Sequence, residues 1–176
     1  MIVSEKEIKE HKIISKVGRS IPVNSKKLKP IGGSGVFLKK FVNRNKTGSE
    51  SLKINSKCNF EKRTQGIIIH INSSNTHRLI LIPHKNIEQI SIIKGREVIN
   101  PLFPSLMWVL LKLNVSLRRA RYFPLRTREY SIEQMELNLR TKNYEIQFLT
   151  SGYNFENQLE FLQRLNINEK LHIIEK

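Results

Sequence analysis

The chain has 176 residues, which suits one domain, and it carries 31 Lys and Arg against 15 acidic residues, a formal net charge of +16. It contains no aspartate, which excludes an EF-hand loop or a paired-aspartate site, and Cys58 is the only cysteine, which excludes an intramolecular disulfide. The charge therefore predicts an anionic partner, either lipid headgroups or nucleic acid, in a reducing compartment.

The first third of the chain, residues 1–64, is a basic and loop-rich segment with a net charge of +11. Its apolar residues predict short strands at His11–Val17 and Val36–Val42. Residues 43–57 have few large apolar side chains, and we expect a protease-sensitive surface loop there. The chain is also rich in Ile and Asn, so AT-rich coding is a second explanation for part of the lysine excess.

Residues 66–166 are expected to form a mainly β domain that ends in a helix, and the tail 167–176 is either a short strand or a frayed end. Runs rich in β-branched residues, bounded by turn formers, predict the strands. Pro83 ends the second of them because it has no backbone N–H. The expected strands are Gly66–Ile71, Thr76–Ile82, Ile87–Ile93, Glu129–Arg140 and Asn143–Thr150.

Two segments have apolar residues at helical spacing. The first is a helical insert at about residues 104–123, although its run LMWVLL would also suit a buried strand. The second is a C-terminal helix at about residues 154–165, which places Phe155, Leu159 and Leu162 on one face. The leucines that define the insert are Leu106, Leu110, Leu113 and Leu117.

The order of elements after residue 66 resembles a bacterial pleckstrin-homology-like or GRAM-like domain. The residues that carry the resemblance are LILIPHKNIEQISIIKG at 79–95, where an Ile-x-x-Ile strand follows a strand and a proline, and the strand–strand–helix order at 129–166. The resemblance implies two roughly orthogonal antiparallel sheets capped by the last helix, and a role in binding phosphoinositides, peptides or proteins. The chain departs from the family because its C-terminal helix lacks tryptophan and a helical segment at 96–128 interrupts the strands.

A cluster of arginines with aromatic neighbours is the main candidate binding site. On a helix these arginines lie on a different face from the leucines, which makes the segment basic and amphipathic. Such a segment can lie on an anionic membrane or hold phosphates while aromatic rings stack on bases, and a solvated helix face without a ligand has the same pattern. The candidate residues are Arg118, Arg119, Arg121, Arg126, Arg128, Lys112, Trp108 and Tyr122.

Two histidines of the first predicted hairpin form a candidate metal pair. If Ser73 and Ser74 make a two-residue turn, His70 and His77 lie directly opposite each other, with Cβ atoms about 5 Å apart. Two imidazoles at that distance could share a metal ion, with Cys58 or His84 as a further ligand. Polar residues at a hairpin end have the same pattern, and we therefore expect no bound metal.

The chain offers no visible catalytic constellation. The glycines of the motif IGGSGV, Gly32, Gly33 and Gly35, are not followed by the Lys-Ser/Thr pair of a phosphate-binding loop, so they indicate a flexible turn. The glutamates are scattered singly, and no nucleophile is paired with a base. We therefore expect a protein that is not an enzyme and needs no cofactor.

The first hypothesis is a binding module that docks on an acidic membrane or an acidic protein through the arginine cluster. The second is a nucleic-acid-binding protein whose segment 1–64 wraps phosphates, and the third is a small structural scaffold subunit whose charge is incidental. The N-terminal residues lack an apolar signal-peptide core, and the longest apolar run, Leu106–Leu111, is too short to span a bilayer. We expect a cytoplasmic protein, free or peripheral at a membrane.

Overall fold

The computed structural model of the chain describes residues 2–4, 9–21, 35–44, 52–73, 76–125, 128–165 and 167–175. The strands are β1 (Ile2–Ser4), β2 (Val36–Asn43), β3 (Lys57–Lys62), β4 (Gly66–Ser73), β5 (Thr76–Pro83), β6 (Ile87–Lys94), β7 (Glu97–Ile99), β8 (Tyr130–Ile132), β9 (Met135–Thr141), β10 (Tyr144–Thr150) and β11 (Leu171–Glu175). The helices are α1 (Glu10–Val17), α2 (Leu106–Lys112), α3 (Leu117–Ala120) and α4 (Phe155–Gln163), with short 3₁₀ turns η2 (His84–Asn86), η3 (Gly152–Asn154) and η4 (Asn168–Lys170).

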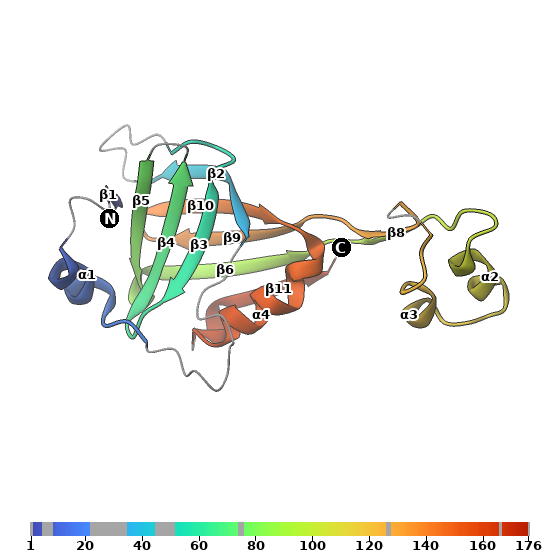
Figure 1. The fold of residues 1–176 in the computed structure, drawn as a ribbon. Helices are drawn as coiled ribbons and strands as arrows, with labels where there is room; N and C mark the ends of the chain where they lie inside the picture. The colour runs from blue at the N-terminus through green and yellow to red at the C-terminus, as the bar shows by residue number, and fades with distance from the viewer. Residues whose placement is uncertain are drawn as a thin grey trace.

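Nine strands form one sheet in the order β1-β5-β4-β3-β2-β10-β9-β6-β11, and β7 pairs only with β8. All pairs are antiparallel except β11, which runs parallel to β6. In Figure 1 the strands β3, β4 and β5 run steeply across β6, β9 and β10, so the sheet bends over itself. The mainly β fold with a C-terminal helix is the predicted class, and strands β2 and β3 of segment 1–64 belong to the same sheet as the later strands.

The concave side of the bent sheet holds the main core, which α4 closes. Phe155, Phe161 and Leu162 of α4 are buried there against isoleucines and leucines of six strands. The ring of Phe60 on β3 lies edge-on to Phe148 on β10, with centroids 5.0 Å apart, and stacks on Phe161 at 6.1 Å. The predicted helix at 154–165 is therefore confirmed as a core element, with α4 spanning 155–163.

The outer side of β4 and β5 carries a second, smaller core beneath α1. Ile68 lies on this face while Ile67 and Ile69 lie on the inner face, which explains the continuous apolar run of β4. The predicted strand at His11–Val17 is wrong, because these residues form α1. Ile13 and Val17 are one helical turn apart and both pack on the sheet, a periodicity of four that the strand interpretation missed.

Two further expectations need correction. The strand predicted at Glu129–Arg140 is interrupted at residues 133–134, so that β8 and β9 belong to different sheets. The loop predicted at 43–57 is a loop only in part, because β2 continues to Asn43, β3 begins at Lys57 and Leu52 is buried in the main core. Residues 45–51 lie outside the described residues. The tail 167–176 contributes β11 to the edge of the sheet.

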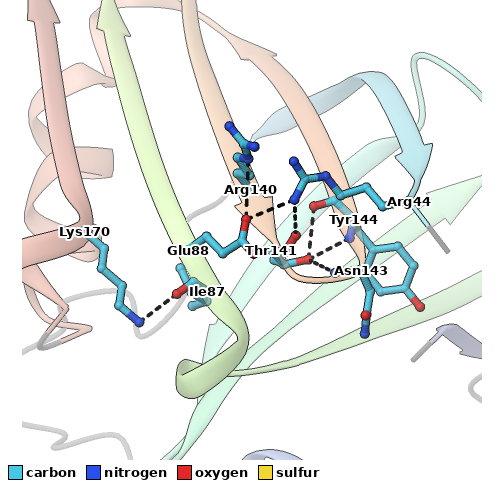
Figure 2. A network of polar contacts seen from close by, with 8 residues as sticks. All are labelled: Arg44, Ile87, Glu88, Arg140, Thr141, Asn143, Tyr144 and Lys170. Carbon is cyan, nitrogen blue, oxygen red and sulfur yellow. Dashed lines mark hydrogen bonds and ion pairs between the residues drawn. The ribbon is translucent and has the colours of Figure 1, made fainter.

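A polar network joins distant parts of the chain at one corner of the sheet (Figure 2). The carboxylate of Glu88 accepts a hydrogen bond from Arg44 at 3.0 Å and lies 3.4 Å from the guanidinium of Arg140. The hydroxyl of Thr141 closes the turn between β9 and β10, because it accepts a hydrogen bond from the Tyr144 N–H at 2.8 Å. These contacts fix the start of β6 against the end of β2.

Candidate binding site at the end of a two-stranded arm

Strands β6 and β9 continue beyond the sheet as the ribbon β7–β8, which carries α2 and α3 at its far end (Figure 1). We call residues 97–132 the arm. The segments that join β6 to β7 and β8 to β9 lie side by side, because the Glu133 N–H donates to the Arg96 carbonyl at 2.9 Å. Gly95 is required there, because a Cβ on it would lie 2.0 Å from the Glu133 carbonyl oxygen. The arm therefore has a defined root.

The end of the arm has a small core of its own. Met107 from α2, Ala120 from α3 and Tyr130 from β8 are buried together, with Leu110 and Leu117 partly buried around them. Ser105 begins α2, since its hydroxyl accepts a hydrogen bond from the Trp108 N–H at 3.1 Å. Region 104–123 thus holds two short helices, and the turn between them includes Asn114 at φ 57.

The buried side chain of Glu129 holds the two ends of the helical region together. Its carboxylate accepts hydrogen bonds from the backbone N–H groups of Leu102, at 2.8 Å, and Leu125. Its own carbonyl accepts a further hydrogen bond from the Asn100 N–H at 2.9 Å. Glu129 is fully buried, so these contacts replace its solvation and fix where the region begins and ends.

The surface of the arm is unusually apolar. Eight of the fifteen exposed large hydrophobic side chains among the described residues lie between positions 99 and 125. Phe103 is 76% exposed and Leu113 is 69% exposed. We call this set the tip patch, and it consists of Ile99, Leu102, Phe103, Leu106, Leu113, Tyr122, Phe123 and Leu125. The small core can cover only one side of each helix, so Leu106 and Leu113 of the predicted leucine stripe are left in solvent.

The predicted cationic residues lie on the same arm as the tip patch. Lys112, Arg118, Arg119 and Arg128 are exposed, and Arg126 lies outside the described residues. Arg118 and Arg119 form no ion pair with any residue that the structure describes. The sequence has no acidic residue from 98 to 128, so this interval contributes no negative side chain to the arm. This acid-free interval is the signal that would have outlined the complete site from the sequence.

Two of the predicted residues take part in ring contacts at the tip. The indole of Trp108 lies edge-on to Phe103 at 5.0 Å between ring centroids. The ammonium of Lys112 lies 5.7 Å from the centroid of the same indole. Trp108 is half-buried and the only tryptophan in the chain. The predicted residues Lys112 and Trp108 therefore belong to one local cluster with Phe103, which the sequence analysis did not select.

Arg121 differs from the other arginines because it faces the root of the arm. Its guanidinium lies 3.3 Å from the carboxylate of Glu97 and donates to the hydroxyl of Tyr130 at 3.3 Å. Hydrogen bonding to the hydroxyls of Tyr122 and Tyr130 raises the pKa of Arg121 above its usual range. Burial raises the pKa of the Tyr130 phenol. Arg121 therefore holds the arm together as well as adding charge to it.

The predicted histidine pair has a different register. His70 pairs with Leu79 and His77 with Asn72, so the two histidines are diagonal neighbours and not directly opposite. The expected two-residue turn at Ser73–Ser74 is wrong, because Ser73 is the last residue of β4 and pairs with Thr76. The two rings still stack, with centroids 5.4 Å apart, and the His70 Nε2 lies 2.9 Å from the Glu61 carboxylate.

The histidine environment offers no metal site among the described residues, where no three potential ligands from His, Cys, Asp and Glu come together. Cys58 is buried on β3, and His84 lies in the turn η2. Hydrogen bonding to His70, ahead of the charge of Arg63, lowers the pKa of Glu61. Of the expected glycine turn, only Gly35 is described, and its φ of 74° suits glycine.

Comparison of the chain with protein-family models, curated proteins and solved structures found no match. None of the helices in the described ranges is long and apolar enough to cross a bilayer.

Proposed function

We propose that this protein is a non-enzymatic binding module whose arm docks on the surface of an acidic membrane. The observation that carries the proposal is the mixture of side chains on the arm. The tip patch offers apolar side chains for the acyl boundary, and the cations of the same arm suit anionic headgroups. Exposed leucines such as Leu113 gain nothing from phosphates or from stacking on bases, which favours the membrane over the nucleic-acid hypothesis.

The expected free energies of the charged and apolar contacts are sufficient for reversible binding of the arm to an anionic membrane. A basic side chain near an anionic membrane contributes about 1 kcal/mol, and four exposed cations therefore contribute about 4 kcal/mol. Burial of one large apolar side chain contributes about 1.5–3 kcal/mol. Phe103 and Leu113 are exposed over most of their surface, so each can gain a large part of that energy on insertion. Both contributions are needed for tight docking, as for a single lipid chain combined with a basic patch.

The pleckstrin-homology-like or GRAM-like resemblance is part of the proposal. It is supported by two groups of antiparallel strands that cross each other and by α4 over the core between them. The edge strands β1 and β11 and the arm are additions to that arrangement. We infer that the arm, an insertion between β6 and β9, carries the docking surface. A peripheral cytoplasmic location follows from this proposal.

Vesicle flotation with phosphatidylglycerol or phosphatidylcholine tests the proposal, with Trp108 emission as a second readout. We expect binding to the anionic vesicles and a blue shift of the emission as the indole enters the interface. The double variant Arg118→Gln/Arg119→Gln should weaken binding about thirtyfold, from about 1 kcal/mol per charge. The control Lys57→Gln/Lys85→Gln removes two exposed charges outside the arm, one on β3 and one in η2, and should change little.

A second pair of variants tests insertion. Leu113→Ser should weaken vesicle binding about tenfold or more, from the lost burial of one leucine. Ile54→Ser removes another exposed apolar side chain, away from the arm, and should leave binding unchanged. If anionic vesicles do not bind at physiological salt, the membrane proposal fails. A gel shift with single- and double-stranded nucleic acid would then separate the nucleic-acid hypothesis from the scaffold hypothesis.

A further inference from the structure

A groove runs between the root of the arm and the end of the sheet. Its volume is about 700 Å³, which lies in the range of pockets for small organic ligands. Tyr122 follows α3, Tyr130 and Ile132 belong to β8, Tyr153 belongs to η3, and Phe155 begins α4. Residues from three stretches of the chain, 94–97, 121–132 and 152–156, therefore build one site.

The wall of the groove is mainly aromatic and apolar. The hydroxyl of Tyr153 lies 3.4 Å from the backbone oxygen of Tyr130, which fixes this side chain across the ribbon. Gly152 forms part of the wall, and a Cβ on it would lie 2.2 Å from the Glu133 carbonyl oxygen. The close approach of the backbone keeps the end of the groove in place. The site is thus preformed and offers rings and an aliphatic side chain to an apolar ligand.

Two cations of the groove can bind an anionic group. The Arg121 guanidinium has five N–H donors; one nitrogen serves Glu97 and Tyr130 and another donor serves the Tyr122 hydroxyl, so further donors remain. The Lys94 ammonium lies 5.3 Å from the Phe155 ring centroid and 3.8 Å from the exposed carboxylate of Glu175, a weak pair. Glu97 and Glu156 are the acidic side chains of the groove that oppose an anion, and Glu97 lies 3.3 Å from Arg121.

The geometry points to a binding site for one anionic amphiphile, a ligand with an apolar chain and a single carboxylate or phosphate. The chain would lie along Tyr153, Phe155 and Ile132, and the head would meet Arg121 and Lys94. Tyr122 belongs both to this groove and to the tip patch, so the groove opens beside the surface that we propose to dock on the membrane. The membrane as the source of the ligand rests on the proposed function, whereas binding itself does not.

Two probes with the same chain and opposite heads test the site: laurate and dodecyltrimethylammonium, both below their micelle concentrations, measured by calorimetry on the full chain. We expect laurate to bind with one site and the ammonium probe to bind at least tenfold more weakly. Lys94→Gln should weaken laurate about fivefold, and Glu156→Gln should strengthen it, because the like charge is removed. Ile132→Trp should fill the groove and abolish binding, with Glu145→Gln as a control away from the groove.

The outcomes separate the groove from the arm. If laurate does not bind, or if the ammonium probe binds as tightly, the proposed site is wrong. If Ile132→Trp is misfolded by circular dichroism, Ser131→Trp serves as the second blocking variant. Leu113→Ser should weaken vesicle binding about tenfold or more and leave laurate binding unchanged. If the protein binds laurate but does not bind anionic vesicles, the proposed ligand site in the groove stands and the proposal of membrane docking is rejected. The ligand would then come from free fatty acids and not from the membrane.

Discussion

The carboxylate of Glu129 accepts a hydrogen bond from the backbone N–H of Leu102, a residue 27 positions earlier in the chain. The same side chain binds the N–H of Leu125, so one buried carboxylate closes the whole helical region of the arm. Helices of seven and four residues do not persist in water on their own. The docking surface that we propose therefore depends on Glu129, although Glu129 itself is buried beneath it.

Replacement of Glu129 by alanine should open the end of the arm without unfolding the sheet. Two partly buried N–H groups would lose a charged acceptor, and a hydrogen bond to a charged group contributes about 1.5–3 kcal/mol. Hydrogen exchange should accelerate at Leu102 and Leu125 and remain unchanged in β4 and β9. Glu133→Ala removes an exposed carboxylate four residues away and serves as the control. Equal exchange rates in both variants would show that Glu129 does not hold the region together.

The root of the arm should not tolerate a side chain at Gly95. Gly95→Ala would place a methyl group 2.0 Å from the Glu133 carbonyl oxygen, so the backbone of one strand must move. We expect a lower melting temperature, and altered amide chemical shifts in both strands of the ribbon, β7 and β8. Ser151→Ala, at an exposed position nearby, should leave both measurements as in the wild type.

Leu162 tests the role of α4 in the main core. It is 4% exposed and lies among phenylalanines and isoleucines, so Leu162→Ala should lower the free energy of unfolding by about 2–5 kcal/mol. Gln163→Ala, on the exposed side of the same helix, should change it by less than about 0.5 kcal/mol. Urea denaturation followed by circular dichroism measures both. A small effect of Leu162→Ala would mean that α4 does not close the core.

The thiol of Cys58 should be inert in the folded protein. Burial raises its pKa from the ordinary value of 9.0 to about 12, so the nucleophilic thiolate is absent near neutral pH. A chromogenic disulfide reagent at pH 8 should react only after denaturation. Because the unfolded thiol loses its proton first, Cys58 favours unfolding progressively as the pH rises above 9.0 towards 12. Cys58→Ala should remove this contribution, and rapid labelling of the native protein would contradict its burial.

The strands with strong apolar patterns could be predicted from the sequence because each pattern is compatible with only one type of secondary structure. The run from Gly66 to Ile71 is too apolar for a surface helix, and Pro83 marks where its partner ends. α1 was missed because Ile13 and Val17 of its IISKV segment lie on one side at a period of two and also at a period of four, and only packing on Ile68 decides between them. Strand β3 was missed because its buried residues, Cys58 and Phe60, alternate with polar ones within a basic segment.

For the candidate site, the sequence identified the arginines but not their surroundings. Helical spacing predicted only that the leucines of the insert share one face, and the two short helices have only Met107, Ala120 and Tyr130 to pack around. The exposure of Phe103 and Leu113 follows from that small core and has no local sequence signal. The groove could not be predicted, because Tyr122, Tyr130 and Tyr153 meet only once the ribbon is in place.

The pairing of β2 with β10 has a consequence for how the chain folds. Tyr144 lies opposite Asn43, and this pair closes a loop of about 100 residues. Leu171 lies beside Ile90, and this pair closes a loop of about 80 residues. Such non-local pairs slow folding, whereas the β4–β5 hairpin is local. We expect the β3–β4–β5 meander to form early and β11 to join last. The arm lies within the connection from β6 to β9, so it can fold independently of the step in which the edge strand β11 joins the sheet.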